Sequence, residues 1–158
     1  MKFQLAATLL SIATLASAIR VSYDSGYDDK DRDLNSVSCS DGDNGLKTKG
    51  FTTQGSLPRF PLIGGASVIG GWNDPNCGTC WTLTNGEYSV TILAVDRASE
   101  VSTTKSEEFT RGEEGTRSLR GFNIGKEAMN QLTGNRAQEV GVVDAQYVKA
   151  DASACGLS

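Results

Sequence analysis

One block of the chain carries more structural information than any other: Gly71-Trp72-Asn73-Asp74-Pro75-Asn76-Cys77-Gly78-Thr79-Cys80-Trp81. Its first half is a dense turn signal, because Asn, Asp, Pro and Gly each favour a turn conformation. Its second half places two cysteines three residues apart, and the remaining cysteines of the chain are Cys39 and Cys155. This spacing alone is compatible with a redox dithiol, with a zinc site made only of cysteines, or with disulfides.

The first 18 residues have the three parts of a secretory signal peptide. Lys2 is positively charged, an apolar run extends from Leu5 to Leu15, and Ala16-Ser17-Ala18 forms a small-x-small cleavage signal. We therefore predict export and cleavage after Ala18, which leaves one domain of residues 19–158. Because disulfides persist in oxidising compartments, an even number of cysteines in an exported chain favours two disulfides.

The composition excludes several classes of protein. The formal net charge is −4 and the sequence pI is about 4.8, so the basic footprint of a nucleic-acid-binding protein is missing and we expect no nucleic-acid partner. After the leader, no apolar run approaches the ~20 residues that a transmembrane helix needs. The chain has no histidine, which rules out Ser-His-Asp catalysis and histidine-based zinc sites. Carboxylates are then the groups left for acid–base chemistry near neutral pH.

Short strands dominate the rest of the chain. Alternating or continuous apolar residues predict strands at 19–23, 37–39, 66–69, 80–84, 88–95 and 138–149. The strands at 80–84 and 88–95 flank Asn85-Gly86, which favours a hairpin with a two-residue type I′ turn. Many short strands separated by turn signals predict a β-rich barrel or sandwich.

One helix is expected near the C-terminus. Asn123 is placed as its N-cap, and Gly134 stands where a C-terminal glycine belongs. Ile124, Ala128 and Leu132 fall on one face at a spacing of four, and we expect that face to pack into the core.

Residues 99–120 differ in composition from their surroundings. They are rich in charged side chains and contain three large apolar residues, namely Val101, Phe109 and Leu119. This is too little apolar surface to contribute to a core, so we predict a flexible polar insertion.

The sequence resembles the cerato-platanin family of small secreted fungal proteins. The similarity runs in order through nearly all of residues 19–158. It is carried by the block quoted above and by Val21-Ser22-Tyr23-Asp24, Cys39-Ser40-Asp41-Gly42, Pro58-Arg59-Phe60-Pro61, Ile63-Gly64-Gly65, Ala94-Val95-Asp96, Gly121-Phe122-Asn123-Ile124 and Ala154-Cys155-Gly156-Leu157.

The resemblance implies a mainly β fold, a six-stranded double-psi β-barrel with small peripheral helices, related to the barrels of expansins and barwin-like proteins. Four cysteines allow three pairings, of which the resemblance implies Cys39–Cys77 and Cys80–Cys155. Members of the family usually run from the strand that ends at Asp96 to Gly121-Phe122 within a few residues. Residues 99–120 are therefore either a natural loop or a retained intron.

For function, the resemblance implies a secreted, non-hydrolytic, expansin-like protein that binds chitin or β-glucan of cell walls. It implies no cofactor, no catalytic residue and no metal, a location outside the cell or in the fungal cell wall, an elicitor role in plant defence, and self-association. Two alternatives stay open: an endoglucanase-like hydrolase with Asp96 as general acid, and a surface-active wall protein that self-assembles. Hydrolysis normally needs a second carboxyl group at a fixed separation, and no motif here identifies one.

Asp96 is the first candidate for sugar binding. It ends an apolar strand, where a carboxylate without a partner would be costly. In related barrels a comparable aspartate lies in the sugar groove, which is one interpretation. The other is that Asp96 caps a turn or pairs with Arg97 or Arg59.

Five further candidates come from loops and strand ends. Asp24 and Asp28 could bind sugar hydroxyls, or they could belong to a solvated acidic loop. Asn76 and Asn123 could line the groove, or they could cap backbone groups. Tyr27 lies in a polar loop and is expected to be exposed and able to stack on a sugar.

The two tryptophans are separate cases. Trp81 follows a cysteine in a predicted strand, so we expect it in the core. Trp72 lies in the turn, where it could be a buried residue or an exposed ring that stacks on sugar.

Overall fold

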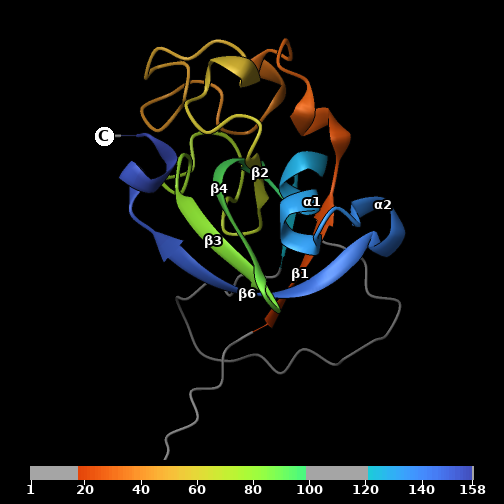
Figure 1. Ribbon diagram of the computed structural model, residues 1–158. Coiled ribbons are helices and arrows are strands. Elements are labelled where there is room, and N and C mark those ends of the chain that lie inside the picture. The colour runs from red at the N-terminus through yellow and green to blue at the C-terminus, as the bar shows by residue number, and fades with distance from the viewer. Residues whose placement is uncertain (1–17, 99–120, 158) are drawn as a thin grey trace, which may run out of the picture.

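The computed structural model describes residues 18–98 and 121–157 (Figure 1). Most of the predicted signal peptide and the predicted insertion at 99–120 lie outside these residues. In the described part the strands are β1 (Ala18–Tyr23), β2 (Ile63–Ala66), β3 (Cys80–Asn85), β4 (Tyr88–Arg97), β5 (Phe122–Ile124) and β6 (Val142–Ala150). The helices are α1 (Lys126–Thr133) and α2 (Ala137–Val140), together with the short 3-10 helices η1 (Ser25–Asp28), η2 (Leu34–Ser36), η3 (Gln54–Ser56) and η4 (Ala152–Cys155).

The strands form a closed barrel in the order β1-β5-β2-β4-β3-β6, with β6 pairing back onto β1. The pairs β1/β5 and β2/β4 are parallel, and the other pairs are antiparallel. This is the six-stranded double-psi β-barrel that the resemblance implies, and the fold prediction is confirmed. The loops between β1 and β2 gather at one end of the barrel, while α1 and α2 lie along its side (Figure 1).

Strand β2 lies three residues earlier than the sequence pattern predicts, at Ile63–Ala66 instead of 66–69. Glycine has a low strand propensity, which hides a strand that contains Gly64 and Gly65. The barrel needs a glycine there, because a Cβ at Gly64 would lie 2.6 Å from the Asn123 carbonyl oxygen and the Ile124 Cα. Close approach of β5 therefore sets the residue type.

The hairpin of β3 and β4 is confirmed, but its turn is shifted by one residue. Asn85 pairs with Tyr88, so the two turn residues are Gly86 and Glu87. Gly86 has a φ of +60°, and glycine at the first central position is what a type II′ turn requires. Asn85 stays in the strand, where its side-chain Nδ2 donates to the Leu132 carbonyl of α1.

The core fills the barrel and the space beneath α1. Trp81 is 7% exposed, and its ring packs edge-on against Phe122 at a centroid distance of 5.8 Å. The predicted core position of Trp81 is confirmed. From α1, Ala128, Met129 and Leu132 are buried, and that helix packs against β4. The apolar face predicted for the helix is therefore in the core.

The start of the helix differs from the prediction. Asn123 belongs to β5, and Gly125 occupies the N-cap position of α1. Glycine has no side chain to cap with, and Asp28 of η1 accepts from the backbone N–H groups of Lys126 and Glu127 instead, at 2.7 and 3.0 Å. A carboxylate at this end of a helix also interacts favourably with the helix dipole. Gly134 ends the helix with a φ of +62°, as expected.

All four cysteines form disulfides, Cys39–Cys77 and Cys80–Cys155, the pairs that the resemblance implies. The dithiol and zinc alternatives are therefore wrong. The bridges span 38 and 75 residues, and a chain-entropy estimate gives each about 4 kcal/mol of stabilisation. Residues 37–39 do not form the predicted strand. They belong to a loop that is attached to the barrel by the bridge and by a hydrogen bond from the Cys39 N–H to the Val95 carbonyl.

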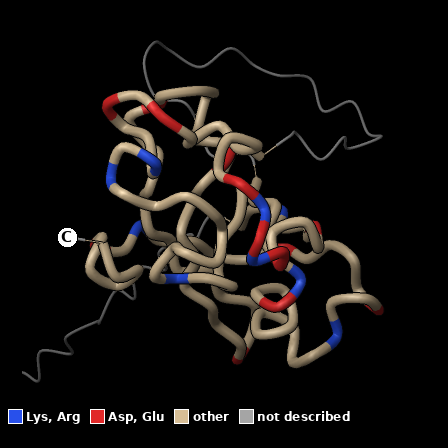
Figure 2. Tube along the Cα trace, turned by 90° about the horizontal axis from the view of Figure 1, so that it is seen from above, with Lys and Arg blue, Asp and Glu red and all other residues tan. Residues whose placement is uncertain are grey.

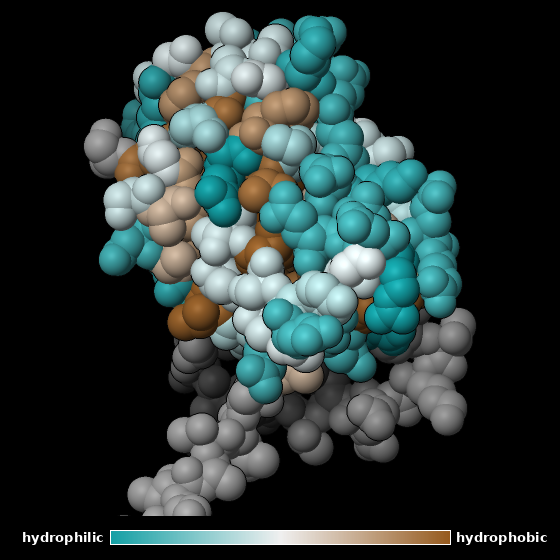
Figure 3. Space-filling view, viewed as in Figure 1, coloured by the Kyte–Doolittle hydropathy of each residue, from teal (hydrophilic) through white to brown (hydrophobic). Residues whose placement is uncertain are grey.

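The surface carries mixed charges. Figure 2 shows acidic and basic residues interspersed over the loops. On the face shown in Figure 3, strongly hydrophobic residues lie in small separate groups between polar ones. None of the helices described for this chain is long and apolar enough to cross a membrane.

Candidate functional site

Asp96 lies near the end of β4, half-buried, and accepts four hydrogen bonds. Its Oδ1 accepts from the Ser38 N–H at 2.9 Å, the Ser38 hydroxyl at 2.7 Å and the Arg97 N–H at 2.8 Å. Its Oδ2 accepts from the Tyr27 hydroxyl at 3.1 Å. The carboxylate thus connects the loop of Ser38 and helix η1 to the barrel.

The two arginines suggested as ion-pair partners of Asp96 make other contacts. Arg97 contributes its backbone N–H, and the Arg59 side chain donates instead to the Thr91 carbonyl at 2.9 Å.

The strand register aligns three polar residues and one glycine from four neighbouring strands at one level of the barrel. Asp96 of β4 pairs with Gly65 of β2, Gly65 pairs with Asn123 of β5, and Asn123 pairs with Ser22 of β1. We call Ser22, Asn123, Gly65 and Asp96 the polar row. Adjacent strands lie about 4.8 Å apart, so Asp96 and Asn123 are roughly 10 Å from each other across the sheet.

The polar row faces outward from the barrel on β1 and β5. Val21, Phe122 and Ile124, the sequence neighbours of Ser22 and Asn123, are fully buried, and side chains alternate between the two faces of a strand. Ser22 and Asn123 are half-buried, and the Ser22 hydroxyl donates to Asn123 Oδ1 at 3.1 Å. Gly65 places no side chain between Asn123 and Asp96.

Tyr27 is 4% exposed, so the expectation of an exposed stacking ring is wrong. Its hydroxyl reaches Asp96, and the Arg32 guanidinium lies over its ring at 5.6 Å from the centroid. Burial, followed by the neighbouring negative charge of Asp96, raises the pKa of Tyr27 well above its usual value near 10. The buried ring holds Asp96 in place and offers no free face to a ligand.

Asp24 lies close enough to Tyr27 for its charge to raise the pKa of that phenol further. Its own Oδ1 caps η1 by accepting from the Gly26 N–H at 2.8 Å, and its side chain is exposed. The structure therefore brings Asp24, Tyr27 and Asp96 together.

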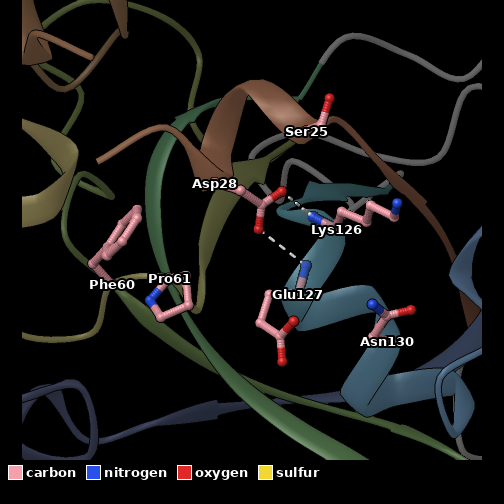
Figure 4. A pocket seen from close by; sticks show the side chains of 7 residues that line it. All are labelled: Ser25, Asp28, Phe60, Pro61, Lys126, Glu127 and Asn130. Atoms are coloured by element: carbon pink, nitrogen blue, oxygen red, sulfur yellow. Dashed lines mark hydrogen bonds between the residues drawn. The ribbon is translucent and has the colours of Figure 1, made fainter. Parts of the chain in front are cut away.

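Asp28 lines a separate groove of about 500 Å³ between η1, the Phe60-Pro61 segment and α1. In Figure 4 its carboxylate points at the first residues of α1, and Phe60 and Pro61 stand opposite that helix. Both carboxylate oxygens accept from helix N–H groups. The remaining lining residues are Ser25, Lys126, Glu127 and Asn130.

Asn76 holds its own turn. Its Nδ2 donates to Asp74 Oδ1 at 2.9 Å and to the Val68 carbonyl at 3.3 Å, and its backbone N–H also donates to Asp74. These bonds correspond to the capping role that the sequence left open for Asn76.

Sequence reasoning missed Ser22, Ser38 and Gly65. The alternation of Val21, Ser22 and Tyr23 marks Ser22 as outward-facing, so that residue could have been found. Ser38 bonds to a carboxylate 58 positions away, and no local pattern indicates such a contact. Among the residues that the structure describes, no three acidic or cysteine side chains are placed to hold a metal ion.

The fold and site define a class of small, disulfide-bonded, six-stranded barrel proteins. The sequence model of one such family, Cerato-platanin, matches residues 19–118 and 116–157. The chain belongs to the cerato-platanin family, a family of secreted fungal proteins.

Individual relatives support the same family assignment. The chain is 38% identical to the heat-stable 19 kDa antigen of Coccidioides posadasii, over 93% of this chain and 87% of that protein. It is 37% identical to cerato-platanin of Ceratocystis fimbriata f. sp. platani, over 94% of each.

Among solved structures, cerato-platanin 1 of M. perniciosa matches with a TM-score of 0.71 and 40% identity, over 88% of this chain and 99% of that one. The solution structure of the fungal elicitor Cerato-Platanin matches with a TM-score of 0.66 and 37% identity, over 87% of this chain and 96% of that one.

Proposed function

We propose that this protein is a secreted, non-hydrolytic, expansin-like protein that binds chitin or β-glucan of cell walls. The observation that carries the proposal is the polar row, a line of hydrogen-bonding groups on the outside of the barrel. Binding there would compete with the non-covalent contacts between polysaccharide chains.

The chemistry of the polar row suits a neutral sugar chain. Asp96 Oδ1 already accepts three hydrogen bonds, so Oδ2, which accepts from Tyr27, is the oxygen that would take a sugar hydroxyl. An Asn side chain both donates and accepts. Asn123 Oδ1 already accepts from Ser22, so its Nδ2 is the group directed to a ligand in this proposal. Asp96 is held by several bonds before any ligand arrives, so little ordering entropy would oppose binding.

The other candidates take secondary roles. Asp24 would add an acceptor at the edge of the polar row, since it lies near Tyr27. Tyr27 would act by positioning Asp96. Asp28 and Asn76 use their side chains in local hydrogen bonds, so they would support the loops beside the ligand.

Hydrolysis by Asp96 is the less supported alternative. A general acid must present a proton, whereas Asp96 Oδ1 faces two backbone N–H groups that can only donate. A surface-active wall protein is the second alternative, and on the face shown in Figure 3 strongly hydrophobic residues lie only in small separate groups. One solved relative is called a fungal elicitor, and elicitation of plant defence belongs to the proposal as a role of the secreted protein.

A pull-down on insoluble chitin and cellulose, combined with a reducing-sugar assay, tests the proposal. We expect binding without release of reducing ends. Release of reducing ends that is lost in the Asp96→Asn variant would favour the hydrolase alternative. Absence of binding to both polymers would remove the carbohydrate role.

Asp96→Asn tests the site. The amide can keep Oδ1 as acceptor for Ser38 and can donate Nδ2–H to the Tyr27 oxygen, so the fold should persist. Loss of a charged acceptor should weaken sugar binding by about 1.5–3 kcal/mol. Asp33→Asn is the matched control, because Asp33 is an exposed cap of η2 outside the polar row. If the Asp96 variant unfolds and its folded fraction binds normally, Asp96 has only a structural role.

A further inference from the structure

Trp72 is 65% exposed, although tryptophan is usually among the most buried side chains. It lies between β2 and β3 and is fixed there, because its indole N–H donates to Asp41 Oδ1 at 2.5 Å. That bond lowers the pKa of Asp41. The ring is thus exposed and oriented at the same time.

The loop that carries Trp72 is joined to the loop of Asp41 by a second set of bonds. The Asn44 N–H donates to Asn73 Oδ1, and Asn44 Nδ2 donates to the Asn73 carbonyl, both at 2.9 Å. Asn73 has a φ of +56°, which L-residues seldom adopt. The Cys39–Cys77 bridge ties the two loops together covalently. Several independent contacts therefore hold a ring that contributes little to the core.

We propose that Trp72 is a stacking platform for a sugar ring of the same polysaccharide that the polar row binds. This inference rests on the proposed function. With the N–H engaged by Asp41, the exposed part of the indole offers its flat face, which can contact the C–H face of a pyranose. The Asp41 carboxylate is exposed, and the oxygen that does not bond to the indole can accept from a sugar hydroxyl.

The acidic neighbour of the ring favours a neutral partner. Asp41 bonds to the indole and would repel an anionic lipid surface or a nucleic acid, and the charge of Lys47, which also acts on Asp41, offsets part of that repulsion. A neutral polysaccharide fits both the aromatic ring and the carboxylate.

The platform and the polar row are connected by a short segment. Ser38 bonds to Asp96, and Asp41 bonds to Trp72. Asp41 follows Ser38 by three positions, and three extended residues span at most about 11 Å. One oligosaccharide of several units can therefore reach both places.

The test is a titration of chitin and cellulose oligomers of increasing length by calorimetry. Trp72→Ala should bind a hexasaccharide about three- to tenfold more weakly than the unaltered protein does. Trp72→Phe should restore part of the loss. Tyr88→Ala is the matched control, because Tyr88 is also exposed but lies eight residues from Asp96 along β4, roughly 26 Å away.

Intrinsic fluorescence gives a second readout. The chain has two tryptophans, and Trp81 is buried. Hexasaccharide binding should therefore shield Trp72 from a soluble quencher such as acrylamide, and this protection should vanish in Trp72→Phe.

The possible failures are distinguishable. If Asp96→Asn weakens hexasaccharide binding and Trp72→Ala does not, the platform is wrong and the proposed function stands. If neither protein nor variant binds any oligomer, the proposed function fails and the platform fails with it. Co-sedimentation with phosphatidylserine vesicles that depends on Trp72, without any effect on sugar binding, would also overturn the platform.

Discussion

The two ends of the block from Trp72 to Trp81 are built in opposite ways. At the Trp81 end, β3 enters the barrel and the ring packs against Phe122 inside the core. At the Trp72 end, the ring is exposed and is held by Asp41, while Asn44 binds its neighbour Asn73. Burial of apolar surface organises the first end, and local polar bonds organise the second. The same residue type thus supports the fold at one end and remains available for contacts at the other.

The largest expected effect comes from truncating the buried ring. Trp81→Ala should lower the free energy of unfolding by about 3–5 kcal/mol, because a large cavity is left in the core. Trp72→Ala, the matched substitution, should change it by no more than about 0.5 kcal/mol. Denaturant unfolding of both variants checks this. Equal losses would break the contrast between the two ends.

Removing the bridge at the loop end should have the next largest effect. Replacing both Cys39 and Cys77 by Ala should cost about 2–4 kcal/mol, since the bridge restricts the unfolded chain. The same change at Cys80 and Cys155 should cost about 0.6 kcal/mol more, because that bridge closes a segment about twice as long. Thermal unfolding under non-reducing conditions measures both. A much smaller loss at the loop end would show that the polar bonds alone hold it.

A smaller effect than loss of a bridge is expected at Tyr27, which joins loop and barrel through Asp96. Tyr27→Phe removes one hydroxyl that bonds to a carboxylate. We expect the free energy of unfolding to fall by an amount at the lower end of about 1.5–3 kcal/mol, because Asp96 Oδ2 can accept from water instead. Sugar binding should fall as well if the hydroxyl positions Asp96. A binding loss without a stability loss would separate the two roles.

The same residue predicts a pH dependence. The phenol is charged when it loses its proton, and its pKa in the folded state is raised above the unfolded value near 10. The contribution of Tyr27 to the free energy of unfolding is therefore fully present below about pH 10, and it is lost as the pH rises from there toward the folded-state pKa. Stability of the native chain should fall more steeply above pH 10 than that of Tyr27→Phe. Parallel curves would show that Tyr27 does not carry the effect.

Sequence reasoning works best where a pattern is local. The hairpin, the buried face of α1 and the core position of Trp81 follow from side-chain alternation and spacing. It fails where the deciding partner is distant. Asp28 caps α1 from 98 positions away, so the local pattern assigns that role to Asn123. Close approach of β5 at Gly64, and of the Arg97-Ala98 backbone at Gly65, requires the glycines that hide β2.

The candidate site shows the same division. Asp96 can be found from the sequence because a carboxylate at the end of an apolar strand needs partners. Its neighbours in the polar row come from β1, β2 and β5, and only the register of a closed barrel places them together. The polar sequence neighbours of Tyr27 predict an exposed ring, yet its hydroxyl bonds to Asp96 and the ring is buried.

The closure of the barrel has a consequence for how copies of this chain can meet. Each of its six strands pairs with a neighbour on both sides over part of its length, so the described barrel has no free edge strand to accept a strand from another molecule. Growth of a continuous intermolecular sheet would require the barrel to open first. Self-association of the described barrel should therefore use side-chain surfaces, and should be sensitive to substitutions on them while leaving the strand pairing unchanged.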